Sequence, residues 1–279
     1  HYDSYIRGRL IHEEKLEAEA NALLAAAATM GSDAAMDSAL AAFAKADTES
    51  PRQETRAAIV DLCERLHQSI GYQSSVEKYG ANNAQRSAVL DFVDFPLNNR
   101  WWYEDQFKEI RALGSDADKL QRLNVIATWE NPGTGSFYDD IGNIAQSEHV
   151  LRGESLSTDP LMRRHMNPDF MWWDDGRSRL RQSWVSKMDW PMGLRYDDLD
   201  AEADYVVRTT GLSQCLLRVN GERVEPTLDG KKIGEIKEFP VPRKLYEDGT
   251  IILTFDVPEE PGINWRDASR LTEVWLIKR

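Results

Sequence analysis

The chain has 279 residues, which is enough for one large domain or two of medium size. Its formal net charge of −13 and its isoelectric point near 4.9 argue against a general nucleic-acid binder, because neutralising phosphates requires clustered Lys and Arg. The same acidity disfavours an anionic membrane surface, and no run approaches the roughly 18 apolar residues of a membrane span. The simplest role of the acidic excess is solubility.

The first quarter of the chain has the periodicity of helices. Apolar residues spaced three or four apart predict a first helix over residues 4–29, which Gly31 ends. A second helix is predicted from Ser32, and a third after Ser50-Pro51, where a capping serine and a first-turn proline are typical of a helix start. The segments between them are short, so the long helices are expected to pair antiparallel.

Helical signals are weaker in the next part of the chain. Residues 72–86 are polar, and the stretch 91–97 is too short and too close to a proline to predict a helix. Asn98 or Asn99 can cap a following helix. A last helix is predicted from about 116 to 129.

The pattern changes to that of strands near Leu194. Short apolar segments separated by Gly, Pro and Asp turns predict antiparallel strands at residues 192–196, 203–209, 215–219, 250–255 and 271–277. Such strands at regular spacing indicate an antiparallel β-sandwich. The long Trp-rich stretch before them is expected to wrap the sandwich rather than to form a free linker.

The predicted fold class is α+β. An N-terminal domain of antiparallel helices, residues 1–128, is expected to precede an antiparallel β-sandwich domain, residues 129–279, whose first part, about 129–190, is the Trp-rich wrapping segment. Cys63 and Cys215 have neither the spacing of a zinc site nor that of a disulfide framework. Both are therefore expected to be buried free thiols.

Residues 129–143, WENPGTGSFYDDIGN, are the most informative segment of the sequence. They combine turn-forming residues, neighbouring aromatics and paired carboxylates where the helical pattern gives way to the strand pattern. Aromatic faces beside carboxylate and amide groups suit sugar recognition. The segment is expected to be too irregular for a helix or strand interior. It is also expected to lie where the two halves meet, with Phe137 or Tyr138 substantially buried.

The acidic residues of this segment allow three roles. Asp139, Asp140 and Asn143 could supply oxygen ligands to a cation such as calcium, or an aspartate could bond its own backbone in a structural turn. A catalytic role would place Asp139 and Asp140 with His149 and Arg152 in the active site of a glycoside hydrolase or lyase. Sequence neighbours rarely hold their carboxylates the roughly 5–10 Å apart that glycosidases require.

Adjacent tryptophans offer a second candidate site. Trp172-Trp173 is followed by two aspartates, a glycine and Arg177. This mixture of stacking faces, acceptors and a donor is typical of a sugar-binding rim. The alternative is that these tryptophans pack at a domain interface.

A third candidate lies in residues 261–270, the predicted loop before the last strand. Binding residues concentrate on loops that a rigid scaffold carries. Trp265 offers a stacking face, while Arg266 and Arg270 offer bidentate donors to a uronate or a sulfate. The alternative is a structural lock between an arginine and Asp267.

Several of these segments carry a resemblance to a known group of proteins. The sequence from about residue 97 to 279, with WENPGTGSFYDDIGN, the LRY and YVVR strands and the closing SRLTEVWLIKR, resembles the C-terminal region of large planctomycete-type bacterial proteins thought to act on polysaccharides. The β half also resembles a galactose-binding-like or malectin-like jelly roll. In such jelly rolls, loops at one edge often bind sugar and a calcium ion often braces the sandwich, although the acids of a usual calcium loop cannot be matched one to one here. The resemblance supplies no catalytic residues.

The expected function is that of a non-catalytic carbohydrate-binding and scaffolding portion of a larger secreted or periplasmic polysaccharide-processing protein. Its expected partner is an acidic or sulfated polysaccharide, and calcium is the one cofactor considered. Two other roles stay open: part of a glycoside hydrolase or polysaccharide lyase active site, and a structural clamp on a missing catalytic domain. The chain opens at His1 without a signal peptide, which is typical of a mature or excised piece with a domain or chain upstream.

Arg266→Ala is expected to weaken binding of an acidic or sulfated glycan by about 10–100-fold, because a charge-assisted hydrogen bond contributes roughly 1.5–3 kcal/mol. Calorimetric titration of the wild-type and variant chains measures the change, and the melting temperature should stay the same. Arg266→Lys should restore only part of the affinity if the contact is bidentate. Unchanged affinity, or a melting loss as large as that of a core truncation, would assign Arg266 to the lock with Asp267.

Overall fold

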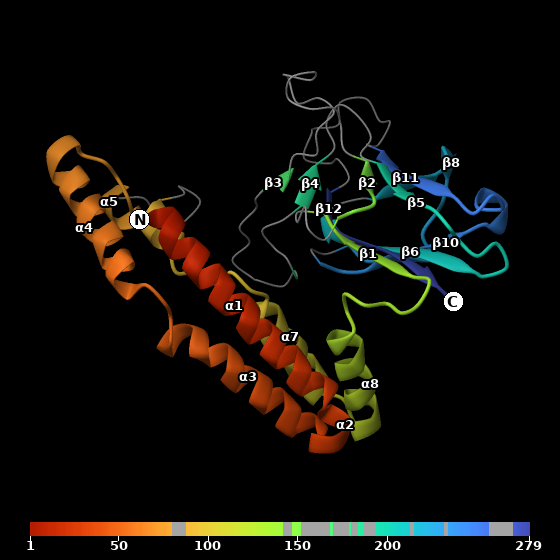
Figure 1. The fold of residues 1–279 in the computed structure, drawn as a ribbon, viewed down its shortest axis with the longest axis horizontal. Coiled ribbons are helices and arrows are strands. Elements are labelled where there is room, and N and C mark those ends of the chain that lie inside the picture. The colour runs from red at the N-terminus through yellow and green to blue at the C-terminus, as the bar shows by residue number, and fades with distance from the viewer. Residues whose placement is uncertain are drawn as a thin grey trace. The chain divides into compact units, whose positions relative to one another are not determined.

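The chain divides into two compact units, residues 1–127 and 128–279, and the division falls one residue before the predicted boundary. In the first unit the structure is helical, and in the second it consists of antiparallel strands, so the fold class is α+β as predicted (Figure 1). None of the described helices is long and apolar enough to cross a membrane. The computed structural model describes residues 1–79, 88–141, 147–151, 168–169, 179, 184–186, 193–212, 215–231, 234–256 and 270–279.

The helical unit contains two long antiparallel runs of helix. Gly31, at φ 91°, reverses the chain after the first run, because glycine adopts positive φ without a side-chain clash. The second run then returns alongside the first (Figure 1). The described helices are α1 (Tyr2–Ala25), α2 (Ala27–Met30), α3 (Ser32–Thr48), α4 (Gln53–Ile70), α5 (Val76–Tyr79), α6 (Val89–Phe92), α7 (Arg100–Arg111) and α8 (Asp116–Ala127).

Small side chains let α1 and α3 approach closely. Ala20 of α1 and Ala35 and Ala39 of α3 have no exposure to solvent. Larger apolar groups fill the space beside them, among them Met36 and Phe43. The alanine content of the sequence therefore serves helix–helix packing as well as helix propensity.

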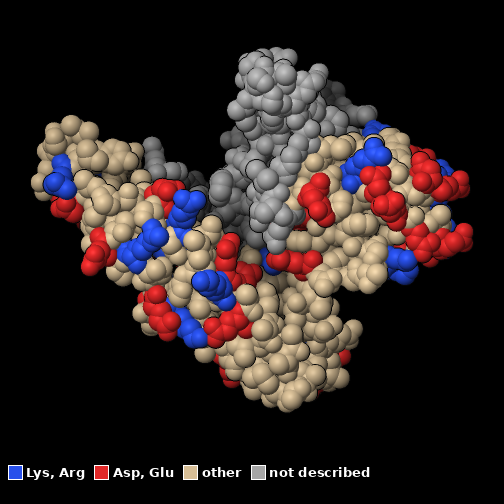
Figure 2. Space-filling model, viewed as in Figure 1, with Lys and Arg blue, Asp and Glu red and all other residues tan. Residues whose placement is uncertain are grey.

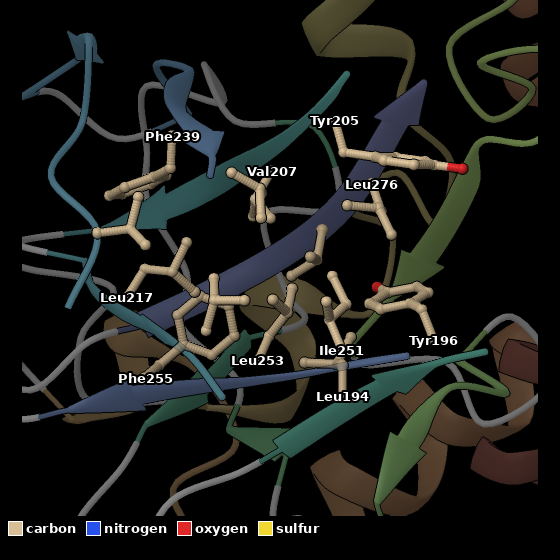
Figure 3. Packing of buried hydrophobic residues seen from close by; sticks show 14 of the residues in the cluster. Leu194, Tyr196, Tyr205, Val207, Leu217, Phe239, Ile251, Leu253, Phe255 and Leu276 are labelled. Carbon is tan, nitrogen blue, oxygen red and sulfur yellow. The ribbon is translucent and has the colours of Figure 1, made fainter. Parts of the chain in front are cut away.

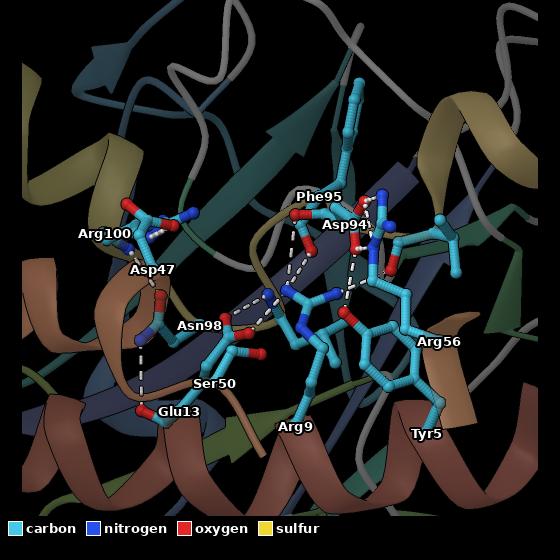
Figure 4. A network of polar contacts seen from close by, with 12 residues as sticks. Tyr5, Arg9, Glu13, Asp47, Ser50, Arg56, Asp94, Phe95, Asn98 and Arg100 are labelled. Atoms are coloured by element: carbon cyan, nitrogen blue, oxygen red, sulfur yellow. Dashed lines mark hydrogen bonds and ion pairs between the residues drawn. The ribbon is translucent and has the colours of Figure 1, made fainter. Parts of the chain in front are cut away.

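A row of polar side chains on α1 binds the irregular segment before α7 (Figure 4). Arg9 donates to the carbonyl oxygens of Val93 at 2.6 Å and Phe95 at 2.8 Å, and pairs with Glu13 at 2.5 Å. Glu13 in turn accepts the backbone N–H of Leu97 at 2.7 Å. Arg9 and Glu13 are almost fully buried, so this segment obtains from α1 the backbone partners that a regular helix would supply internally.

Helix α4 also contacts the irregular segment before α7, through a second group of polar side chains. Asp94 accepts a hydrogen bond from Tyr5 at 2.8 Å and is held through both oxygens by Arg56. The Arg56 guanidinium lowers the pKa of the Asp94 carboxyl, so the ion pair persists below neutral pH. Helices far apart in the sequence are joined here through one short segment.

The β unit consists of two antiparallel sheets. Described strands of the first sheet, in spatial order, are β3 (Pro168–Asp169), β4 (Trp184–Ser186), β12 (Arg270–Lys278), β6 (Tyr205–Leu212), β10 (Lys237–Val241) and β9 (Leu228–Asp229), with β1 (Phe137–Asp140) also paired to β12. The second contains β2 (Val150–Leu151), β5 (Gly193–Tyr196), β11 (Ile251–Asp256), β7 (Leu216–Val219) and β8 (Glu222–Arg223). A 3₁₀ turn, η3 (Arg243–Leu245), precedes β11.

Both sheets contribute to one hydrophobic core. Along β5, β6, β7, β10 and β11, alternate residues point inward, as expected for sheets with one covered face. Figure 3 shows the inward side chains of the two sheets meeting between them. Fully buried members include Val207, Phe239 and Leu276 from the first sheet and Leu217, Leu253 and Phe255 from the second.

Strand register identifies one end of the two sheets. Arg270 lies opposite Ser186 and Leu212 in the first sheet, whereas Gly193 lies opposite Leu151 in the second. Only residues 213–215 connect Leu212 of the first sheet to Leu216 of the second, so these strand ends are close in space. We call this the β11–β12 end, defined by Leu151, Ser186, Gly193, Leu212, Leu216, Asp256 and Arg270.

Two sequence expectations are wrong in detail. Residues 137–140 form strand β1, because β12 supplies the pairing partner that the local pattern does not indicate. The helix predicted after Ser50-Pro51 begins at Gln53, following Arg52 in a left-handed conformation. Arg52 donates to the carbonyl oxygen of Ser4, which holds this turn against α1. Cys63 and Cys215 are both buried thiols outside any disulfide, as predicted.

Arg9→Met is expected to lower the free energy of unfolding by about 3–5 kcal/mol, because it leaves the Glu13 carboxylate buried without its cation. Denaturation followed by circular dichroism at 222 nm reports the helices. Arg65→Met is the matched control, because Arg65 pairs with Asp61 in the same i, i+4 geometry, with both side chains more than 60% exposed. The control should change stability by about 0.5 kcal/mol or less. Equal effects in the two variants would contradict the assigned role of burial.

Candidate functional site

The two adjacent acids of β1 point to opposite faces of the strand. Phe137 packs against the core, and Asp139 on the same face reaches Tyr196 of the second sheet. Tyr138 projects the other way and contacts β12 from outside. Side chains alternate along a strand, so Asp140 shares the outer face with Tyr138. Asp139 and Asp140 are therefore not brought together around one ligand or one cation.

Asp139 is a fully buried acceptor at the edge between the two sheets. Its carboxylate accepts the hydroxyl of Tyr196 at 2.9 Å, the backbone N–H of His149 at 3.2 Å and the Nδ1 of His149 at 3.0 Å. Asp139 belongs to β1 of the first sheet, whereas Tyr196 lies in β5 and His149 directly precedes β2 of the second. The carboxylate thus joins the sheets at this edge with its hydrogen bonds satisfied inside the protein.

The ring of His149 is fixed on three sides. It stacks on Tyr196 with ring centroids 4.6 Å apart, and Phe137 meets it edge-on at 5.1 Å. A carboxylate can only accept a hydrogen bond, so Nδ1 of His149 carries a proton and donates it in the hydrogen bond to Asp139. Nε2 is the ring nitrogen that this hydrogen bond does not use. Nε2 lies 3.8 Å from the exposed carboxylate of Glu148.

Asp139 controls the titration of His149. Burial alone would lower the pKa of the imidazole, but the hydrogen bond and charge of Asp139, together with the charges of Glu148 and Asp197, outweigh it and raise the pKa above its usual value. Burial and the same carboxylate raise the pKa of Tyr196 well above its usual range. Tyr196 therefore remains a donor, and the arrangement is that of an imidazole oriented by a carboxylate, as a general base requires.

A second polar cluster lies on the outer face of β1 and β12, around Glu273. One oxygen of Glu273 accepts from the indole of Trp129 at 2.9 Å, the hydroxyl of Tyr138 at 2.8 Å and the guanidinium of Arg179 at 2.6 Å. The other accepts the hydroxyl of Thr210 at 3.0 Å. Glu273 has no exposure to solvent, and four donors compensate its burial.

Arg179 and two tryptophans complete this cluster. Arg179 is 3% exposed and also pairs with Glu130, with its guanidinium over the ring of Trp129. Trp129 and Trp275 meet edge to face, and the indole of Trp275 donates to the carbonyl oxygen of Trp129 at 2.9 Å. The motif WENPGTGSFYDD and the TEVW strand therefore pack on each other. Aromatic and acidic residues that suggested a sugar site are explained here by internal packing.

Tyr138 acts as a donor in this cluster. Burial, followed by the charge of Glu273, raises the pKa of its hydroxyl well above its usual range. The hydroxyl accepts from Arg179 at 3.3 Å while it donates to Glu273. Phe137 and Tyr138 are each half-buried within the β unit, where they cover β12 and the core.

The structure brings some of the predicted site residues together and separates others. Asp139 and His149 are brought together, whereas Asp140 lies on the other face of β1. Arg270 begins β12, and its side chain lies outside the described part of the chain. Also outside the described residues are Asn143, Arg152, Trp172, Trp173, Arg177, Trp265 and Arg266. Across the part that the structure describes, no three His, Cys, Asp or Glu side chains converge as a metal site would require.

Sequence reasoning did not single out Tyr196, Glu273 or Arg179. Glu273 had a usable signal, because an acid inside an otherwise apolar strand must find partners when that strand is central. Tyr196 and Arg179 had none, because their partners lie 57 and 94 residues away. Long-range pairs of this kind become visible only in the fold.

Comparison with known proteins gives no relatives. No family model matches the chain, and no curated protein or solved structure matches it significantly. The function must therefore be argued from the residues themselves rather than from the fold.

The pKa of His149, measured by NMR titration of its ring, is expected to lie above the usual value of about 6.5, and Asp139→Asn should lower it. A raised folded-state pKa means that His149 contributes stability fully below the unfolded value, and that this contribution is lost as pH rises through the folded value. Glu148→Gln is the control and should have a smaller effect, because Glu148 acts on the ring only through its charge. An unchanged midpoint in Asp139→Asn would contradict the assigned coupling.

Proposed function

We propose that this chain is a non-catalytic carbohydrate-binding and scaffolding portion of a larger secreted or periplasmic polysaccharide-processing protein. The observation that supports it is the β11–β12 end, where strand ends of both sheets meet. Loops carried by such a rigid scaffold are where binding residues concentrate. The segment that bears Trp265 and Arg266 runs between Asp256 and Arg270, which both belong to this end.

A jelly roll of the galactose-binding-like kind is part of the same proposal. Two antiparallel sheets with a shared core are in keeping with it. The chain also passes repeatedly between the sheets, from β5 to β6, β6 to β7, β8 to β9, β10 to β11 and β11 to β12. Repeated exchange between two sheets is a feature of Greek-key and jelly-roll connections.

An acidic or sulfated polysaccharide is the proposed ligand. Trp265 would stack on the sugar, and Arg266 and Arg270 would pair with its anionic groups. Calcium stays in the proposal as a brace implied by the resemblance. An ion shared by Asp139 and Asp140 is not part of it, because these side chains diverge.

The catalytic alternative depends on the Asp139–His149 pair. An oriented imidazole is the observation that favours it. Against it, Asp139 is fully buried and already accepts from Tyr196 and His149, so it orients the ring and does not reach a sugar. Asp140, the carboxylate next to Asp139 in the sequence, lies on the opposite face of β1. A structural clamp on a catalytic domain is the third role and predicts neither binding nor activity.

Affinity electrophoresis and calorimetry of the whole chain with alginate, a sulfated fucan and neutral laminarin should show binding to the anionic polymers only. Arg270→Ala should weaken that binding by about tenfold or more, because it removes a charge-assisted hydrogen bond. Arg243→Ala is the matched control. Arg243 is half-exposed in η3, at the opposite end of the sheets, so its removal should leave the affinity unchanged.

Chromatography of the same incubations tests for oligosaccharide products. Products that disappear in His149→Ala would establish the enzyme instead of the binding module. Absence of both binding and products would leave the structural clamp.

A further inference from the structure

The hairpin between β7 and β8 contains the one Asn-Gly pair of the sequence. Val219 lies opposite Glu222 in the ladder, so Asn220 and Gly221 form a two-residue turn. Their φ angles are 48° and 83°, and positive φ at both central residues is the mark of a type I′ turn. Asparagine and glycine are the residues that enter this left-handed conformation most readily.

The side chain of Asn220 ties this turn to its neighbours. The backbone N–H of Asn220 donates to the carbonyl oxygen of Ile252 at 2.9 Å, and Oδ1 of Asn220 accepts the backbone N–H of Ile252 at 2.8 Å. Both backbone groups of Ile252 in β11 are thereby paired with one residue of the turn. The Nδ2 group donates to the carbonyl oxygens of Leu245 at 2.7 Å and Thr250 at 3.4 Å. The amide therefore joins the turn to β11 and to the end of η3.

An asparagine followed by a glycine is chemically reactive. The backbone nitrogen of Gly221 can attack Cγ of Asn220, because glycine has no side chain to obstruct the approach. The new C–N bond closes a five-membered succinimide, while the bond from Cγ to Nδ2 breaks and ammonia leaves with the proton of the Gly221 N–H. Water then opens the ring at either carbonyl and yields aspartate or isoaspartate. The net reaction exchanges ammonia for water, so it needs neither an oxidant nor a cofactor.

The native turn holds the reacting atoms apart. Ring closure requires the Gly221 nitrogen and the Asn220 side chain to lie on the same side of the Cα–C bond of Asn220. In the left-handed region ψ is roughly +30 to +60°, which places them on opposite sides. The amide must also leave its partners in β11 and η3 before Cγ can turn toward the nitrogen. Asn220 is itself exposed, so its conformation and hydrogen bonds protect it rather than exclusion of water.

We propose that Asn220 is a site of spontaneous deamidation, protected while the turn is paired with β11 and modified when the turn separates from it. The product weakens the same contact. An aspartate keeps the hydrogen bond from Ile252 but is acceptor-only, so its carboxylate faces the carbonyl oxygens of Leu245 and Thr250 without a donor. Isoaspartate also adds a carbon to the backbone of a two-residue turn. Opening of the hairpin is therefore recorded as a permanent chemical change.

The cations beside the turn are already engaged in ion pairs. Lys244 pairs with Glu222 at 2.6 Å, and Arg223 pairs with Glu225 at 3.3 Å. On the face shown in Figure 2, acidic and basic side chains likewise lie interspersed over the β unit. A new carboxylate therefore adds to the net charge of −13. Strand β7 runs from Leu216 at the β11–β12 end to this turn, so the inference concerns the other end of the sheets and does not depend on the proposed carbohydrate function.

Mass spectrometry of the whole chain, digested with trypsin after incubation at mildly alkaline pH, tests the protection. Cleavage after Arg218 and Arg223 releases residues 219–223, whose mass rises when OH replaces NH₂. Conversion should be about tenfold or more faster in denaturing guanidinium chloride than in buffer, because only open states react. Asn131 is the internal control and should stay unchanged in both solutions, because Pro132 has no N–H and cannot close the ring by this route.

Two results of this experiment would overturn the proposal. Equal conversion of Asn220 in buffer and in denaturant would mean that the turn gives no protection. Absence of conversion in the denaturant would mean that the Asn-Gly pair is not a reactive site.

Asn220→Asp introduces the product directly and tests its consequence. Unfolding of β7 and β11 in denaturant, followed by hydrogen exchange, should have a lower midpoint than in the wild type at neutral pH. The difference should shrink below about pH 4, where a protonated carboxyl group donates to Leu245 again. Asn131→Asp is the matched control, because the exposed Asn131 accepts the backbone N–H of Gly133 at 3.4 Å through Oδ1, a role that a carboxylate keeps. A wild-type midpoint in Asn220→Asp, or equal losses in the two variants, would overturn the proposed effect of the product.

Discussion

A carboxylate removed from water must be surrounded by donors, and in the β unit Glu273 imposes this requirement at the middle of the most connected strand. β12 pairs with β1, β4 and β6, so an acid at its centre can be accommodated only if neighbouring elements supply partners. Trp129, Tyr138, Arg179 and Thr210 do so, from four different parts of the chain. The first residues of the unit are thereby tied to its last strand.

The helical unit meets the same requirement in another way. Arg9 and Glu13 lie one turn apart on α1 and are buried as a pair, yet neither is fully satisfied by the other. Their remaining hydrogen bonds go to backbone groups of the segment that includes Val93 and Leu97. The irregular segment is thus held to α1 by buried side chains. Without its backbone groups as partners, the burial of these side chains would lower the stability of the unit.

Local pattern predicted most of this fold and little of the site. The spacing of apolar residues predicts the helices around Leu16, Met36 and Ile59. A helix forms its backbone hydrogen bonds within one segment, so the local sequence is sufficient to indicate it. Strands such as β6 and β11 follow from apolar segments between turns. β1 does not, because four residues rich in polar groups become a strand only by pairing with β12, about 135 residues later in the sequence.

The candidate site shows the same limit. Asp139 and His149 were identified from residue type. Because they are only ten residues apart in the sequence, a contact between them could be predicted from the sequence. The role of Asp139 was not, because the partner that makes it structural is Tyr196 on the other sheet. Acidity and aromatic content indicated sugar chemistry in WENPGTGSFYDD, whereas the cluster around Glu273 accounts for much of that composition by packing.

The position of β12 also affects how the protein is made. Its strand partners β1, β4 and β6 are all synthesised earlier, and none of them can complete the first sheet until residues 270–278 have left the ribosome. At synthesis rates of about 5–20 residues per second, the edge of β6 that β12 will cover stays open for several seconds. The helical unit has no such delay, because its contacts are complete by residue 127. Helices should therefore fold during translation, whereas the β unit closes only after its last strand emerges.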